Sequence, residues 1–340
     1  MSPSLSEEIA ATDRVIELER ALVTTQRALA RAKHKTEDLV DAVYRGAKDA
    51  SVIVGKPSPL PRPPADRRKA GDAEVALLHM TDWQVGKETT SYGSVLAAER
   101  VRRVVAKTIR LTEIQRADHP IKKCVLMLGG DLIEGTQIFA AQAWQVDSEA
   151  FAQVFLAASL VEQTVLTLLD RFDTVEVAEV AGNHGRLGRK GEGPRGDNWD
   201  RIIGRIARDR LGRQRRLTWM ENETNWHAMV QIGNYKALLV HGDQVQGGGG
   251  QLPAYGIFKK AAAWASGVTE PFQDVYLGHY HSAFSVTLPN GGRVFMTPSI
   301  ESGSEYAREF IAMKGKPGQR LHFIDPRRGR ITSEHMIWCD

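Results

Sequence analysis

Side chains that can bind metal ions follow five short apolar runs of the chain, at the points where the runs end. In chain order they are Asp82 and Gln84, Asp131, Asn183 and His184, His241, and His279 and His281. Two carboxylates, two amides and several imidazoles, without a thiolate, form a mixed oxygen and nitrogen ligand set. Such a set suits Mn, Fe, Zn or Ni better than Ca or a structural zinc.

The order of the five fragments carries the signal, because each fragment alone is weak. A Gly-Asp pair after a strand is usually only a turn, and His241 alone is typical of an ordinary strand-end histidine. His279 and His281 are more informative, because alternate residues of an extended chain share a face. The set holds enough ligands for two ions, and a metal pair can stabilise both attacking and leaving oxygens in displacement at phosphorus.

The elements that must position these residues are short strands separated by helices. Expected strands cover residues 74–80, 124–128 and 175–180, and expected helices cover 95–117, 148–171 and 198–212. Later segments read as hairpins around Gly233-Asn234 and Pro289–Gly292, with further strands at 320–324 and 331–337. The pattern predicts an α/β fold with a parallel-rich sheet followed by an antiparallel-rich sheet. The carboxyl ends of strands are where ligand sites gather in open α/β sheets.

The ordered motifs resemble those of the calcineurin-like metallophosphoesterase superfamily, which carries Asp-x-His, Gly-Asp, Gly-Asn-His, His and Gly-His-x-His in this order. The resemblance covers about residues 75–300 and implies two facing mixed β-sheets flanked by helices. It also implies two divalent metal ions, with manganese expected first and magnesium, iron, zinc or nickel as alternatives.

The resemblance assigns roles to the motif residues of this chain. Asp82 and His281 would hold the first metal ion, and Asp131 would bridge the two ions. The second ion would be held by Asn183, His241 and His279. His184 would lie over the phosphate and stabilise or protonate the leaving group.

Two positions depart from the family pattern. Gln84 stands where the family usually has His, and its amide oxygen is a weaker and harder ligand than an imidazole. The first ion is therefore expected to bind loosely, to be Mn- or Mg-like, or to be absent at rest. Gly185 stands where Asp or Glu is common, so the carboxylate that would orient His184 is missing or comes from elsewhere.

The loop after His184 favours a large anionic substrate. Its basic side chains are expected to grip phosphates of a nucleic-acid strand; those assigned to the site are Arg186, Arg189, Lys190 and Arg195. The alternative is a solvated loop whose charges are paired locally with acidic neighbours. Trp144, Trp199 and Trp264 could stack on bases, although core packing is the commoner use of each.

Several stretches, among them TDWQVGK, GGDLIEG and GNHGR, are similar to phage and prophage phosphoesterases, which are described as similar to the SbcD-type DNA repair nuclease. The resemblance implies a metal-dependent phosphodiesterase that hydrolyses DNA by a water activated by two metal ions, as an exonuclease or a nuclease subunit. One alternative is a phosphatase or phosphodiesterase for a small nucleotide. Another is a non-catalytic DNA-binding scaffold with a weakened first metal site.

Three regions are expected along the chain: a helical arm at 1–55, a basic Pro-rich linker at 56–72, and a metallophosphoesterase domain at 73–340. The stretch of residues 56–71 holds five basic residues and one acidic residue, a net charge of +4 that equals the net charge of the whole chain. Apolar residues at a and d spacing in the arm predict either a coiled coil, with a second copy or a partner helix, or a helix packed on its own domain.

Composition and cysteine content set the remaining expectations. No run of about 18 apolar residues is present, so no membrane span is expected. The first residues, MSPSLSEEIAATD, lack the basic start and apolar stretch of a secretory signal. Only two cysteines, Cys124 and Cys339, are present, which excludes a disulfide scaffold. A cytoplasmic location is expected, in the host cytoplasm if the protein is phage-encoded.

Overall fold

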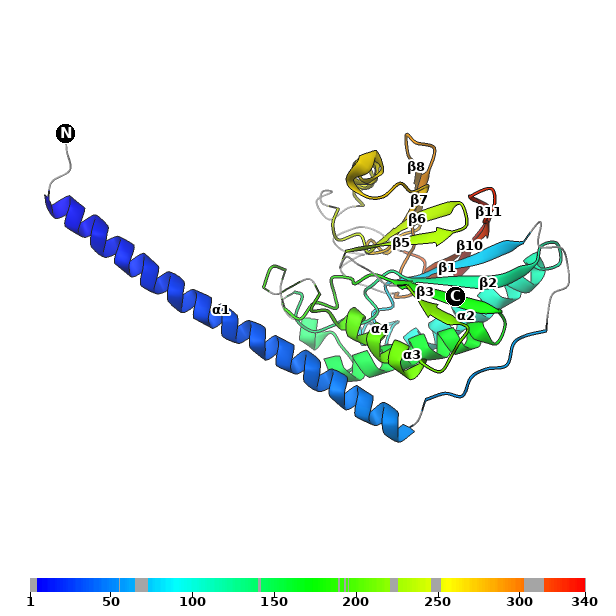
Figure 1. Ribbon diagram of the computed structural model, residues 1–340, viewed down its shortest axis with the longest axis horizontal. Coiled ribbons are helices and arrows are strands. Elements are labelled where there is room, and N and C mark those ends of the chain that lie inside the picture. The colour runs from blue at the N-terminus through cyan, green and yellow to red at the C-terminus, as the bar shows by residue number, and fades with distance from the viewer. Residues whose placement is uncertain are drawn as a thin grey trace. The chain divides into compact units, whose positions relative to one another are not determined.

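The computed structural model describes residues 5–54, 56–64, 73–139, 142–188, 190–192, 194, 196–220, 226–245, 252–302 and 315–339 (Figure 1). The chain divides into two compact units, Met1–Ala47 and Lys48–Asp340. The first strand, EVALLHM, is buried along its whole length, as expected for a strand covered on both faces.

The first sheet has six strands in the order β11-β10-β1-β2-β3-β4. Their bounds are β1 Glu74–Met80, β2 Ile121–Leu128, β3 Thr174–Glu179, β4 Leu217–Trp219, β10 Gly318–Asp325 and β11 Arg330–Trp338. Strands β1 to β4 are parallel, whereas β10 pairs antiparallel with β1 and β11 antiparallel with β10. The expected strands near the carboxyl end of the chain therefore complete the first sheet.

The second sheet has five strands in the order β5-β6-β7-β9-β8. Their bounds are β5 His227–Ile232, β6 Tyr235–Val240, β7 Asp274–Leu277, β8 Phe284–Thr287 and β9 Arg293–Met296. The β5–β6 and β8–β9 pairs are antiparallel hairpins, but β6–β7 and β7–β9 are parallel. This sheet is therefore mixed, and its parallel centre points the ends of β6 and β7 in one direction.

Successive side chains of a strand point to opposite faces of the sheet, so the apolar residues form two layers. In β6, Tyr235, Ala237 and Leu239 contribute to the core between the sheets, while Leu238 and Val240 pack on the opposite side with α5 (Ala254–Ala263). Helices α2 (Ser94–Gln115), α3 (Ala150–Leu169) and α4 (Trp199–Arg210) lie along the outer face of the first sheet (Figure 1). These layers confirm the predicted α/β fold of two facing mixed sheets flanked by helices.

Among the described residues, α3 has the length and composition of a helix that could cross a membrane, but most of it is buried inside the structure. It packs against α2, α4 and β3. This burial is typical of the core helix of a folded domain.

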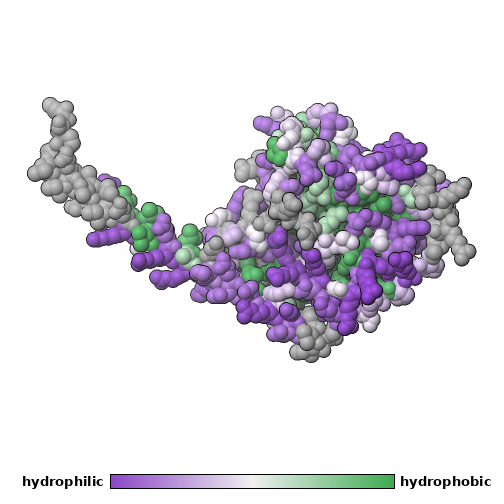
Figure 2. All heavy atoms as spheres, in the orientation of Figure 1, coloured by the Kyte–Doolittle hydropathy of each residue, from purple (hydrophilic) through white to green (hydrophobic). Residues whose placement is uncertain are grey.

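The amino-terminal helix α1 runs from Leu5 to Val54 and corresponds to the predicted arm. Its apolar residues Leu18, Leu22 and Leu29 are exposed and follow the heptad spacing. Figure 2 shows hydrophobic patches on the visible face of this helix, between hydrophilic side chains. Pairing of this seam with a second copy or a partner helix stays a prediction.

Candidate metal centre

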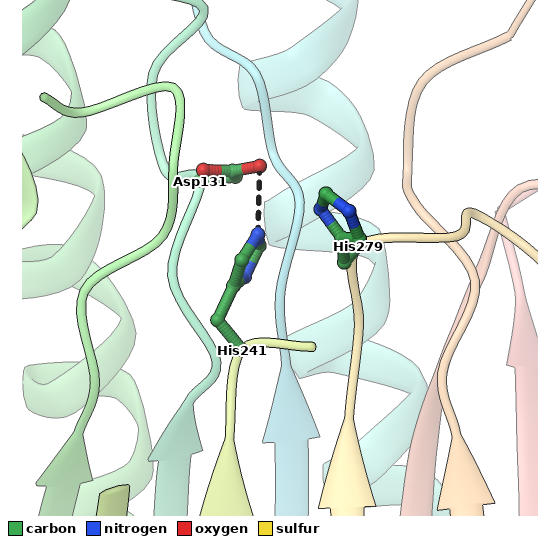
Figure 3. A group of neighbouring side chains, drawn as sticks. All are labelled: Asp131, His241 and His279. Atoms are coloured by element: carbon green, nitrogen blue, oxygen red, sulfur yellow. Dashed lines mark ion pairs between the residues drawn. The ribbon is translucent and has the colours of Figure 1, made fainter. Parts of the chain in front are cut away.

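The predicted ligands come together at the carboxyl ends of five strands. Asp82 follows β1, Asp131 follows β2 and His241 follows β6, so both sheets contribute to the same place. Figure 3 shows Asp131, His241 and His279 on the loops that leave the strand ends, with their side chains turned toward one another. The rule that strand ends of α/β sheets gather ligands therefore applies across two facing sheets.

The position assigned to the second metal ion is the more compact of the two. Candidate ligand atoms of Asp131, His241 and His279 all lie within 4.8 Å of one another. His241 Nε2 is 3.0 Å from Asp131 Oδ2 and 3.1 Å from Asn183 Oδ1. The other ring nitrogen of His241 lies 2.8 Å from the Gly129 carbonyl oxygen, which fixes the ring with Nε2 toward the centre.

The position assigned to the first metal ion is formed by Asp82 and His281. His281 Nε2 is 3.2 Å from Asp82 Oδ1, and His281 Nδ1 is 3.3 Å from Glu301 Oε2. A carboxylate behind the outer nitrogen of a histidine is the arrangement that orients histidine ligands in metal sites. The backbone N–H of His279 donates to both carboxylate oxygens of Asp82, at 3.1 and 3.0 Å, and so links the two positions.

Backbone strain is concentrated on these residues. In the described part of the chain, the non-glycine residues with positive φ are Asp82 (52°), Gln84 (44°), Asp131 (52°), His279 (67°) and His281 (53°). Such conformations cost free energy and persist where the surrounding structure holds them, typically at functional sites. All five belong to the ligand set that the sequence predicts, and the donor set fits divalent metal ions.

The electrostatics of the centre favour a cation. Burial alone would raise the pKa of Asp131, but the neighbouring charges of His241 and His184 lower it below its ordinary value. Burial alone would lower the pKa of His241, but the charge of Asp131 and its hydrogen bond raise that pKa to about 10. The buried carboxylate of Asp131 therefore stabilises a positive charge beside it, either the proton on His241 or a metal ion.

These shifts predict that metal affinity rises with pH. His241 is an imidazolium at neutral pH until an ion binds, and the ion must displace its proton. For one released proton, the apparent affinity for Mn²⁺ should increase about tenfold per pH unit between about pH 6 and pH 9. Calorimetric titration in two buffers of different ionisation enthalpy measures both the affinity and the protons released. An affinity independent of pH would contradict this electrostatic description.

His184 is oriented by residues that the sequence analysis did not identify. Its Nδ1 lies 2.9 Å from the Glu134 carbonyl oxygen, 3.3 Å from Glu134 Oε2 and 3.3 Å from Gln142 Nε2. Burial alone would lower the pKa of His184, but the charges of Asp131 and Glu134 raise it to about 9. The family pattern has an acidic residue at the position of Gly185, next to the histidine. In this chain the carboxylate beside His184 comes from Glu134 instead. The available signal was its position three residues after Asp131 in GGDLIEG.

A second missed residue, Asp200, fastens two of the ligand loops. Its carboxylate accepts hydrogen bonds from the backbone N–H groups of Asp131, Leu132 and Gly182 at 3.0, 3.0 and 2.8 Å. Burial and the charge of Asp131 raise the pKa of Asp200 to about 6. Asp200 lies in the first turn of α4, where Asn198 caps its backbone N–H.

The predicted phosphate-gripping residues are only partly described. Arg186 forms an ion pair with Asp243, so its charge is balanced locally. Lys190 lies on the described part of the loop and is exposed, whereas Arg189 and Arg195 lie outside the described residues. Their role in binding phosphate stays a prediction.

The three tryptophans considered for base stacking differ in exposure. Trp199 and Trp264 are buried, so core packing is their role here. Trp144 is 89% exposed and ends the short helical turn Gln142–Trp144, whose first residue contacts His184. Phe139 precedes this turn and meets the His184 ring edge to face at a centroid distance of 6.3 Å. An aromatic surface therefore adjoins the centre.

No protein-family model matches this chain, and no curated protein matches it. Solved structures with a similar arrangement include Vps29 from Entamoeba histolytica complexed with Zn²⁺, at 13% identity over 78% of this chain and 99% of that one, with a TM-score of 0.34. A purple acid phosphatase from yellow lupin matches at 12% identity over 81% of this chain and 55% of that one, with a TM-score of 0.34.

A phosphatase from Mycoplasma pneumoniae matches at 11% identity over 79% of this chain and 94% of that one, with a TM-score of 0.33. These low identities and scores describe a likeness in the arrangement of elements.

Proposed function

We propose that the protein is a metallophosphoesterase that hydrolyses DNA phosphodiester bonds, as an exonuclease or a nuclease subunit. The observation that carries the proposal is the convergence of the predicted ligands from five strand ends on one buried and strained centre that holds two carboxylates. Asp82 and His281 would hold one metal ion. Asn183, His241 and His279 would hold the other ion, and Asp131 would bind both ions. The ions, when bound, would supply Lewis acidity at the phosphoryl oxygens.

The contribution of the chain's own residues is clearest at His184. Its raised pKa makes the ring an imidazolium at neutral pH, which can donate a proton. The carbonyl and carboxylate oxygens of Glu134 lie beside Nδ1 and accept its proton, whereas Nε2 lies 3.5 Å from the side-chain nitrogen of the predicted metal ligand Gln84. We assign His184 the protonation of the leaving oxygen as the phosphoester bond breaks.

Metal analysis of the purified protein, combined with hydrolysis assays across Mn, Mg, Ni and Zn, tests this function. The proposal expects bound metal and Mn-stimulated cleavage of single-stranded DNA, faster than cleavage of a small chromogenic diester. Turnover of the small diester alone would favour the small-nucleotide alternative. DNA binding without turnover under any of the four metals would favour the non-catalytic scaffold that Gln84 suggests.

The preference for a nucleic acid is tested at Trp144. Base stacking on an exposed aromatic side chain contributes about 1–3 kcal/mol per base, so Trp144→Ala should raise KM for single-stranded DNA by about 5- to 150-fold. Hydrolysis of a small diester without a base should be unchanged. Trp144→Phe, which keeps an aromatic face, serves as the control and should retain most of the affinity. Equal losses on both substrates would show that Trp144 acts on the centre itself and not on a base.

A further inference from the structure

Lys87 places a positive charge beside the first metal position. Its Nζ donates a hydrogen bond to Gln84 Oε1 at 3.2 Å and lies 3.6 Å from Glu301 Oε2. The side chain is 15% exposed and that of Glu301 is 4% exposed, so this is a largely desolvated ion pair. The backbone N–H of Lys87 also donates to the Gln84 carbonyl oxygen at 3.0 Å, which fixes the turn that presents the lysine.

Glu301 connects this ammonium group to the ligands of the first position. Its Oε2 is the atom that contacts both Lys87 Nζ and His281 Nδ1, at 3.6 and 3.3 Å. His281 in turn contacts Asp82 through Nε2. The charge of Lys87 is therefore linked to the first position through a continuous series of polar contacts.

Gln84 also connects Lys87 to the first metal position. The oxygen of its side chain is the atom by which an amide can coordinate a metal ion, and this oxygen accepts the hydrogen bond of Lys87. Coordination through Gln84 would therefore require the oxygen to exchange the ammonium for the ion. Two cations close together in a buried site also repel each other more strongly than they would in water.

Among the described contacts of the second position there is no lysine or arginine, so the positive charge there is the proton of His241, which a metal ion displaces. The atoms within hydrogen-bonding distance of His241 Nε2 are oxygens of Asp131 and Asn183. Arg186, the basic residue that follows the candidate ligand Asn183, forms an ion pair with Asp243. The two positions thus differ in the charge already present beside them.

We propose that Lys87 acts as a built-in cation at the first metal position, so that the chain binds one metal ion tightly at the second position and another only weakly at the first. The inference rests on the proposed phosphoesterase function and specifies its metal stoichiometry. One of the three N–H donors of the ammonium group makes the hydrogen bond to Gln84, and the charge of the group forms the ion pair with Glu301.

Calorimetric titration of the full chain with Mn²⁺ tests this directly. The unaltered protein should bind one ion tightly and a second at least about tenfold more weakly. Lys87→Met and Lys87→Gln should each tighten the weak site by about tenfold or more and leave the tight site unchanged. Lys87→Arg keeps the charge and should behave as the unaltered protein does.

Electron paramagnetic resonance of the bound Mn²⁺ provides a second readout. With one equivalent of Mn²⁺ the unaltered protein should give the spectrum of an isolated ion, and with two equivalents the Lys87→Met protein should give that of an exchange-coupled pair. Two equally tight sites in the unaltered protein, or a weak site that neither neutral substitution strengthens, would overturn the inference. Absence of tight Mn²⁺ binding in every protein would instead refute the metal centre on which the proposed function depends.

Discussion

Asp131→Asn is expected to abolish turnover and to lower the bound metal content. Asp131 is the carboxylate that we propose holds both metal ions, and its oxygens lie 3.0 Å from His241 Nε2 and 2.7 Å from the backbone nitrogen of His184. The substitution keeps the shape of the side chain but removes its charge. Loss of several kcal/mol of transition-state stabilisation corresponds to a decrease in kcat of about 10³-fold or more.

A matched carboxylate makes the result specific. Asp118 is exposed and lies shortly before β2 begins, at the opposite end of that strand from Asp131. Asp118→Asn should therefore leave both activity and metal content unchanged. Full activity in Asp131→Asn, measured on single-stranded DNA with Mn²⁺ present, would rule out a mechanism in which this carboxylate holds the ions.

His184→Ala is expected to lower kcat on DNA by about 10²–10⁴-fold, the usual contribution of a general acid. Metal content should remain unchanged, because His184 is assigned to the leaving group and not to an ion. A diester with a nitrophenolate leaving group needs no protonation, so its hydrolysis should fall much less.

Glu134→Gln separates orientation from proton donation. Glu134 acts through its contact with His184 Nδ1, so we expect a loss of about 10–100-fold on DNA and a lower pKa for the acidic group in the pH profile of kcat. Equal losses by His184→Ala on DNA and on the nitrophenyl diester would contradict the role of His184 as the acid.

The clustering of the candidate ligands was predictable from the sequence because their positions obey a local rule. Each of them lies at the carboxyl end of a strand, and strand ends can be recognised from apolar runs followed by glycine and polar residues. The order of strands in the sheets was not predictable in this way. Pairing of β10 with β1 joins residues such as Arg320 and His79, far apart in sequence, and such pairings leave no local pattern.

The residues that hold the ligands in place were missed for the same reason. Glu301 contacts His281, and Asp200 contacts the backbone of two loops, through hydrogen bonds that exist only in the folded chain. In the sequence, Lys87 is an ordinary charged residue of a turn. Its position beside the first metal position follows only from its distances to Gln84 and Glu301.

The central claim is that the strand-end residues of both sheets form one metal centre. Anomalous diffraction from crystals of the full chain soaked in Mn²⁺ tests it most directly, because the signal locates the ion independently of activity. We expect an anomalous peak within coordinating distance of Asp131, His241 and His279, and its loss in Asp131→Asn crystals. A structure with no peak among these three residues, or with manganese bound only elsewhere, would contradict it.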